Sequence, residues 1–168
     1  MVLTRARDEA VPAALEAVYR ARHADFLRVA TAITGNVELG RDAVQDGLTR
    51  ALAARRSFRR TGSLEAWLWK VIVNAARNLR RDIRRPEPTS EQVTDCYLQE
   101  AARDDDAARL RERIARLPER QRLVLFLRYY ADLDYAAIAR VLGVRRGTVA
   151  ATLNHAHAAV RSSLEVEE

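Results

Sequence analysis

The chain has 168 residues, of which 48% are hydrophobic and 31% charged, a balance that suits a packed globular protein and excludes wholesale disorder. Its 29 basic and 23 acidic residues give a net charge of +6, which favours a polyanionic partner. The single cysteine excludes an intramolecular disulfide framework and a cysteine-cluster zinc site. No apolar run approaches the roughly 20 residues of a membrane span and no signal-peptide core follows Met1, so we expect a soluble cytoplasmic protein.

The first half of the chain is predicted to form three amphipathic helices, because aromatic residues make up only 6% and apolar residues recur at three- and four-residue steps. The first helix is predicted from about Pro12, which suits a first turn, to a stop at Gly35 and Asn36. The second covers about residues 39–52. The third runs from Ser63, an N-cap candidate, to Arg85.

Charge divides the chain into three parts. Residues 1–88 carry 17 basic and 10 acidic groups, residues 89–108 carry 1 and 6, and residues 109–168 carry 11 and 7. Pro86 and Pro88 stop a helix that arrives from the N-terminal side. We therefore predict an all-α protein with two small helical domains, residues 1–86 and 109–168, joined by a flexible acidic linker over residues 87–108.

The spacing of residues 135–154 is that of a helix-turn-helix. Ala139 is small where two helices would cross, Gly143 suits a left-handed turn, and Val149 starts the buried side of the second helix. The opposite side carries side chains that can contact phosphates and base edges. These are Arg145, Arg146, Thr148, Thr152, Asn154 and His155. An ordinary helical hairpin with a glycine turn is the alternative.

The long third helix carries cations, amides and a tryptophan opposite its apolar stripe, a mixture that suits unstacked bases and phosphates. The face comprises Trp67, Lys70, Asn74, Arg77, Asn78, Arg81, Arg84 and Arg85. Arg59 and Arg60 lie just upstream. A solvated basic surface without a partner is the alternative. Because Leu68 and Ile72 set the core direction, Trp67 and Trp69 cannot both face the core.

Four segments together resemble the sigma-70 family of RNA polymerase sigma factors, specifically the extracytoplasmic-function (ECF) group, over about residues 15–164. Asp42-Ala-Val-Gln-Asp46 is similar to the family's acidic segment, and residues 67–78 resemble its promoter-melting segment. Leu117-Pro-Glu-Arg-Gln-Arg-Leu-Val-Leu125 resembles the entry to the C-terminal domain. Residues 134–144, with Gly147-Thr-Val149, resemble its helix-turn-helix.

The resemblance implies a transcription initiation factor that is not an enzyme, has no cofactor or metal site, and does not insert into a membrane. The resemblance implies three partners. Core RNA polymerase would be bound through its β′ clamp helices and its β flap, and the other two are promoter DNA and an anti-sigma factor. The residues implied for core polymerase are Asp42, Gln45 and Asp46. Those for the minus-ten element are Arg59, Arg60, Trp67, Lys70, Asn74, Arg77, Asn78 and Arg81. Those for the minus-thirty-five element are Arg145, Arg146, Thr148, Ala151, Thr152 and His155.

Two parts of the chain depart from the family pattern. The family has Lys or Arg after the Gly-Thr-Val segment and again one turn on, where this chain has Ala150, Ala151 and Thr152, then residues 154–157. Fewer cations release fewer counterions, so we expect either weak minus-thirty-five binding or a shift toward protein contacts. Gly47 replaces a bulkier apolar residue, which weakens a helix by up to ~1 kcal/mol relative to Ala unless close packing requires it.

Two other functions were weighed. A dimeric helix-turn-helix regulator that is not a sigma factor explains residues 117–164 but gives residues 67–85 and 42–46 no role. A metal-dependent enzyme would use His155, His157 and Cys96. The two histidines are two residues apart on a predicted helix and diverge, so they cannot easily share one ion.

Overall fold

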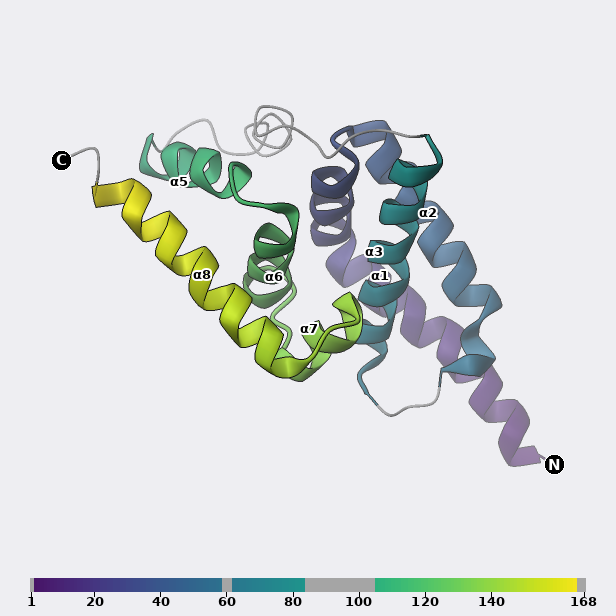
Figure 1. The fold of residues 1–168 in the computed structure, drawn as a ribbon. Helices are drawn as coiled ribbons and strands as arrows, with labels where there is room; N and C mark the ends of the chain where they lie inside the picture. Colours follow the sequence, from purple (N-terminus) through teal and green to yellow (C-terminus); the bar gives the residue numbers. More distant parts are fainter. Residues whose placement is uncertain (1, 59–61, 84–104, 166–168) are drawn as a thin grey trace.

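The computed structural model describes residues 2–58, 62–83 and 105–165, and over these ranges it contains seven α-helices, one 3-10 turn and no strand. The predicted all-α fold is confirmed (Figure 1). The elements are α1 (Val2–Thr34), α2 (Val37–Ala53), η1 (Arg55–Ser57), α3 (Leu64–Asp82), α5 (Asp105–Ala115), α6 (Glu119–Tyr129), α7 (Tyr135–Leu142) and α8 (Arg146–Glu165). None of these helices is long and apolar enough to cross a membrane.

Helices α1, α2 and α3 pack against one another to form the first group. Its core contains Phe26 and Trp69, both fully buried, with ring centroids 4.4 Å apart at 60°. Side-chain caps fix where the helices begin, because the first backbone N–H groups have no partner within the helix. Asn36 accepts a hydrogen bond from the Leu39 amide at 3.0 Å, and Ser63, the predicted N-cap, accepts one from the Ala66 amide at 3.0 Å.

The start of α1 differs from the prediction. The helix begins at Val2, and Pro12 lies inside it and not in its first turn. A proline inside a helix removes one backbone hydrogen bond and crowds the preceding turn, yet it does not forbid the helix from continuing. The first-turn preference of proline was therefore the wrong guide to this boundary.

Gly47 lets α2 approach α3 closely. A Cβ atom at this position would lie 2.8 Å from Ile72 Cγ1, inside any normal contact distance. Gly47 is buried on α2, and Ile72 is fully buried on α3. The departure from the family pattern at this position is therefore matched by close helix packing, the case in which a helical glycine is retained.

Helices α5 to α8 form the second group, in which α6 and α7 pack against α8. Asp134 caps α7 by accepting a hydrogen bond from the Ala137 amide at 2.7 Å. Gly143 ends α7 in the left-handed conformation (φ 67°, ψ 38°), and the Val144 amide donates to the Ala139 carbonyl at 2.9 Å. Val149 is fully buried, as the helix-turn-helix spacing requires.

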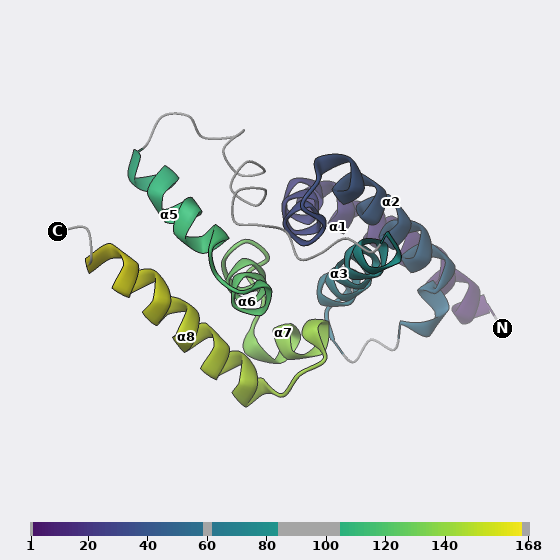
Figure 2. The same cartoon turned by 45° about the horizontal axis from the view of Figure 1, so that its top comes forward.

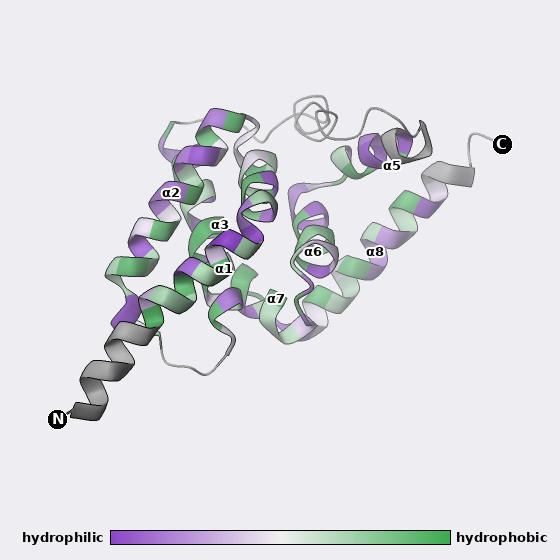
Figure 3. Cartoon of the chain, turned by 180° about the vertical axis from the view of Figure 1, so that it is seen from behind, coloured by the Kyte–Doolittle hydropathy of each residue, from purple (hydrophilic) through white to green (hydrophobic). Residues whose placement is uncertain are grey.

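The two groups also touch each other. Helix α7 packs along α3, and α6 contacts α1 (Figure 2). Hydrophobic and hydrophilic residues alternate around the helices in both groups, as expected for helices that bury one face (Figure 3). The buried apolar side chains of the two groups form one continuous cluster.

Candidate nucleic-acid interface

Helix α3 exposes half of the described residues of its predicted nucleic-acid face fully to solvent. Lys70, Asn74 and Arg81 are exposed, whereas Trp67 and Asn78 are half-buried. The opposite side of the same helix buries apolar residues, namely Ala66, Leu68, Trp69, Ile72, Val73, Ala75 and Ala76. The amphipathic pattern thus brings the polar residues together on one side of the helix. Arg59, Arg60, Arg84 and Arg85 lie outside the described residues.

The two tryptophans of α3 point to different environments. Trp69 is fully buried against Phe26, while Trp67 is half-buried and its ring lies 5.5 Å from the ring of Phe58, tilted by 48°. The prediction that both could not face the core is confirmed, and Trp67 is the one at the rim. A rim aromatic beside exposed cations can stack on an unpaired base.

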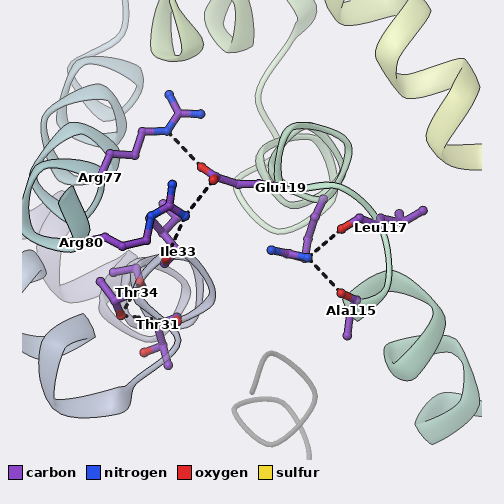
Figure 4. A network of polar contacts seen from close by, with 10 residues as sticks. Thr31, Ile33, Thr34, Arg77, Arg80, Ala115, Leu117 and Glu119 are labelled. Carbon is purple, nitrogen blue, oxygen red and sulfur yellow. Dashed lines mark hydrogen bonds and ion pairs between the residues drawn. The ribbon is translucent and has the colours of Figure 1, made fainter. Parts of the chain in front are cut away.

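Arg77, a predicted residue of this face, contacts the second group of helices (Figure 4). Its Nε atom lies 3.3 Å from Glu119 Oε1, at the start of α6. Arg80 Nη1 lies 2.8 Å from Glu119 Oε2 and also donates to the Ile33 carbonyl at 3.2 Å. Sequence reasoning missed this contact because residues 77 and 119 are far apart in the chain and no local periodicity relates them.

The predicted acidic patch lies on α2. Asp42 and Gln45 are exposed and Asp46 is half-buried, so the three side chains share the outer side of this helix. Asp46 Oδ2 accepts a hydrogen bond from Arg50 Nε at 2.8 Å, one turn along. This hydrogen bond, together with the attraction between the charges, raises the pKa of Arg50. The patch therefore includes one carboxylate that is already paired and one, Asp42, at the surface.

The recognition helix α8 has two cations at its start and no further Lys or Arg before Arg161 near its other end. Arg145 and Arg146 are exposed where α8 begins. Along the same helix Ala151 and His155 are exposed and Thr148 and Thr152 half-buried, while the buried side is formed by Val149, Leu153 and Ala156. The predicted contact residues therefore share the outer side of α8, which carries little charge beyond its first turn.

A groove that sequence analysis did not predict lies between α5, α6 and α8. It has a volume of about 440 Å³ and is mainly apolar. Its lining residues are Leu110, Ile114, Leu125, Phe126, Tyr129, Tyr130, His157, Val160 and Arg161. Tyr129 is 63% exposed, and its hydroxyl lies 2.9 Å from His157 Nε2. We call it the apolar groove. The sequence feature that could have predicted it is the helical spacing of apolar residues on α5 and α6, more of them than one buried face needs.

The histidine pair of the enzyme alternative does not form a common site. His155 is exposed on the outer side of α8, whereas His157 lies in the apolar groove against Tyr129. Cys96 lies outside the described residues.

Comparison with known proteins agrees with this architecture. Residues 18–86 match the family described as Sigma-70 region 2, and residues 107–160 match Sigma-70, region 4. The ECF RNA polymerase sigma factor SigM of Mycobacterium tuberculosis is 30% identical, the match covering 81% of this chain and 69% of that protein. The RNA polymerase sigma factor YlaC of Bacillus subtilis is 27% identical, covering 89% of this chain and 91% of the relative.

Two solved structures share the fold. One is CnrH in complex with the cytosolic domain of CnrY, with a TM-score of 0.70 at 20% identity over 99% of this chain and 97% of that one. The other is the sigma factor RpoE with the anti-sigma factor NepR from Bartonella quintana, with a TM-score of 0.68 at 22% identity over 94% and 98% of the two chains. Helical architecture, chain order and relatives agree on one class, the two-domain bacterial sigma factors. This chain belongs to the sigma-70 family, in its ECF group.

Proposed function

We propose that this chain binds core RNA polymerase, directs it to specific promoters and stabilises the opened DNA strands there. The observation that carries the proposal is the outer side of α3, where exposed Lys70, Asn74 and Arg81 lie opposite a fully apolar buried side. A helix with cations, amides and a rim tryptophan along one side can hold phosphates and unstacked bases at the same time.

The outer side of α3 is proposed to contact the minus-ten element. Flipping a base out of the duplex costs a few kcal/mol, which stacking and contacts to the base edge must offset. Trp67, beside Phe58, supplies an aromatic surface for stacking. Asn74 and Asn78 can donate to and accept from base edges, and Lys70 and Arg81 can neutralise phosphates. Arg59 and Arg60 are proposed to extend this contact.

Core polymerase is proposed to bind at two places. The acidic patch of Asp42, Gln45 and Asp46 would dock on the β′ clamp helices, because a negative surface in a basic domain repels DNA and suits a basic protein partner. The apolar groove would take the β flap, because a groove between helices suits an apolar helix face.

The second group of helices is proposed to bind the minus-thirty-five element through α8. Arg145 and Arg146 would contact phosphates, while Thr148, Ala151, Thr152 and His155 would face the major groove. Residues 1–86 and 109–168 would act as two DNA-binding domains on a linker of residues 87–108. Tethering gives each domain a high effective concentration at its element once the other is bound.

Regulation and location follow from the same family relationship. An anti-sigma factor is proposed as a partner, since the structural relative RpoE was solved in complex with the anti-sigma factor NepR. The factor is proposed to act in the cytoplasm, where the polymerase is, and to catalyse no reaction of its own.

Run-off transcription with purified core polymerase and a library of genomic fragments tests the proposal. We expect promoter-dependent transcripts from a subset of fragments only when this chain is added. The variant Asn74→Ala should keep its affinity for core polymerase and lose most of these transcripts. If no fragment yields a chain-dependent product, although the chain binds duplex DNA without polymerase, the protein would be a regulator of the non-sigma kind.

A further inference from the structure

The apolar groove of the second group leaves large apolar side chains in contact with water. It lies between α5, α6 and α8 and has a volume of about 440 Å³. Of the side chains that line it, Leu110 on α5 is 42% exposed and Tyr129 on α6 is 63% exposed. Contiguous apolar surface that stays open in this way marks a contact site for another molecule.

The shape of the groove favours a helix face over a small molecule. Small-molecule sites enclose about 70–90% of the ligand surface, whereas two walls of this groove are themselves partly open. Leu110 and Ile114 lie one turn apart on α5, and Leu125 and Tyr129 lie one turn apart on α6. Rows of apolar side chains at this spacing can take the side chains of another helix. Because such a floor accepts any apolar helix face, a choice of partner needs a polar contact as well.

Polar side chains of α6 and α8 form one border of the groove. The Tyr129 hydroxyl lies 2.9 Å from His157 Nε2, and the two ring centroids are 5.9 Å apart with the rings tilted by 47°. This contact joins α6 to α8 at the border. Arg161 follows His157 by four residues, so both side chains lie on the same side of α8, and both line the groove.

The groove has charge of one sign. The described residues that line it include Arg161 and no Asp or Glu. Arg161 is exposed, so a partner can reach its guanidinium. A guanidinium binds a carboxylate through paired, charge-assisted hydrogen bonds, and it repels a second cation. The groove therefore complements an apolar helix face that has a carboxylate at its border.

We propose that the apolar groove selects an amphipathic helix with a carboxylate beside its apolar face, and that Arg161 is the residue that binds this carboxylate. The inference rests on the function proposed above, in which the groove takes the β flap of core polymerase. It adds what the bound helix must carry, an Asp or Glu next to Arg161. Helix α8 would then serve DNA through residues near its start and a protein partner through Arg161 near its other end.

Fluorescence anisotropy with labelled, stapled helical peptides and the full chain tests this selection, with no polymerase present. Stapling is needed because short helices are marginal in water. The peptides share one apolar face and carry one variable residue, placed in turn at each position along its border as Glu, Gln or Lys. At the position that meets Arg161, Glu should bind about three- to fivefold tighter than Gln, as for a partly exposed ion pair. Lys should bind more weakly than Gln.

Charge reversal at Arg161 identifies the residue responsible. In Arg161→Glu the order of the peptides should reverse, so that Lys binds most tightly. Arg116→Glu is the matched control, because it changes the net charge equally at an exposed arginine that is not among the residues lining the groove. This control should keep the preference for Glu, which separates a local contact from the general attraction of a basic chain for an acidic peptide.

Leu110→Ser shows where the peptides bind. Leu110 is partly exposed, so the helical circular dichroism should be unchanged. The substitution should weaken the Glu, Gln and Lys peptides by similar factors, because it removes an apolar contact common to all three. The proposal is wrong if no peptide binds, if the three residues bind alike at every position, or if Leu110→Ser has no effect. A preference for Glu that survives in Arg161→Glu would also overturn it.

Competition with core polymerase connects the groove to the proposed partner. A saturating Glu peptide should weaken binding of the N-terminally labelled chain to core polymerase, since the contact at the groove is lost while that at the acidic patch remains. Unchanged binding would assign the groove to another protein and overturn the selection of the β flap. The run-off assay reads promoter function separately, so a failure there would leave the peptide measurements intact.

Discussion

The two groups of helices differ in how charged and apolar side chains are distributed over their proposed contact surfaces. On α3 the exposed side carries Lys70, Asn74 and Arg81 along most of the helix. On α8 the exposed cations are Arg145 and Arg146 at its start and Arg161 near its other end, where an apolar groove lies between α5, α6 and α8. The difference fits the proposal above, in which the first group makes charged and stacking contacts with DNA. The second has less charge for DNA and more apolar surface for a protein.

The largest expected effect concerns the two tryptophans of α3, of which Trp69 lies in the core and Trp67 at its rim. Trp69→Ala removes a fully buried ring packed on Phe26 and should lower the free energy of unfolding by about 3–5 kcal/mol. Urea unfolding followed by circular dichroism measures it. Trp67→Ala, at the rim, should be clearly milder for stability while weakening single-stranded DNA binding. Equal destabilisation by the two substitutions would contradict the division of roles.

The next effect tests the acidic patch. Asp46→Arg should lower the affinity for core polymerase about 100-fold, because a like-charge contact at an interface costs several kcal/mol. The fold should be kept, since the pair that Asp46 forms with Arg50 lies at the surface. A pull-down with purified core enzyme measures it. Glu16→Arg, at an exposed ion pair on α1, is the control and should bind normally. Unchanged binding of Asp46→Arg would remove this patch from the interface.

Substitution of one glycine in each group tests how closely its helices pack. Gly47→Ala should destabilise by about 1–3 kcal/mol despite its better helix propensity, because its Cβ would lie 2.8 Å from Ile72 Cγ1. Gly147→Ala on α8 meets no atom within 4 Å and should be neutral or stabilising by up to about 1 kcal/mol. Chemical denaturation measures both. A stabilised Gly47→Ala variant would show that α2 and α3 are not held this closely.

The smallest effect concerns the sparse charge of α8. Arg146→Ala should weaken binding to a duplex and reduce the slope of log affinity against log salt by about one unit. Fluorescence anisotropy over a salt series measures it. Arg116→Ala, whose exposed side chain pairs with Glu112, should leave the slope unchanged. An unaltered slope for Arg146→Ala would mean that this side chain touches no phosphate.

The parts of the fold that follow from short-range rules were predictable. Ser63 as an N-cap, Gly143 as a left-handed turn and Val149 as a buried residue all depend on spacings of a few residues. The polar side of α3 follows from helical periodicity in the same way. The start of α1 was not predictable, because the first-turn preference of Pro12 is weak evidence for a boundary.

The parts that depend on distant residues were not predictable. Nothing near Arg77 in the sequence points to Glu119, and the apolar groove forms only when α5, α6 and α8 meet. The sequence shows that a glycine at position 47 weakens a helix unless close packing requires it. The structure supplies that packing, because Ile72 on the neighbouring helix leaves no room for a side chain at this position.

The sequence by itself determined the helices, their caps and the polar and apolar sides of each, since those depend on backbone preferences and on neighbours three or four residues away. Only the tertiary structure decided which cation of α3 is covered, where a partner-sized groove opens and how the two groups of helices meet. Those outcomes depend on contacts between residues dozens of positions apart, which periodicity along one helix does not encode.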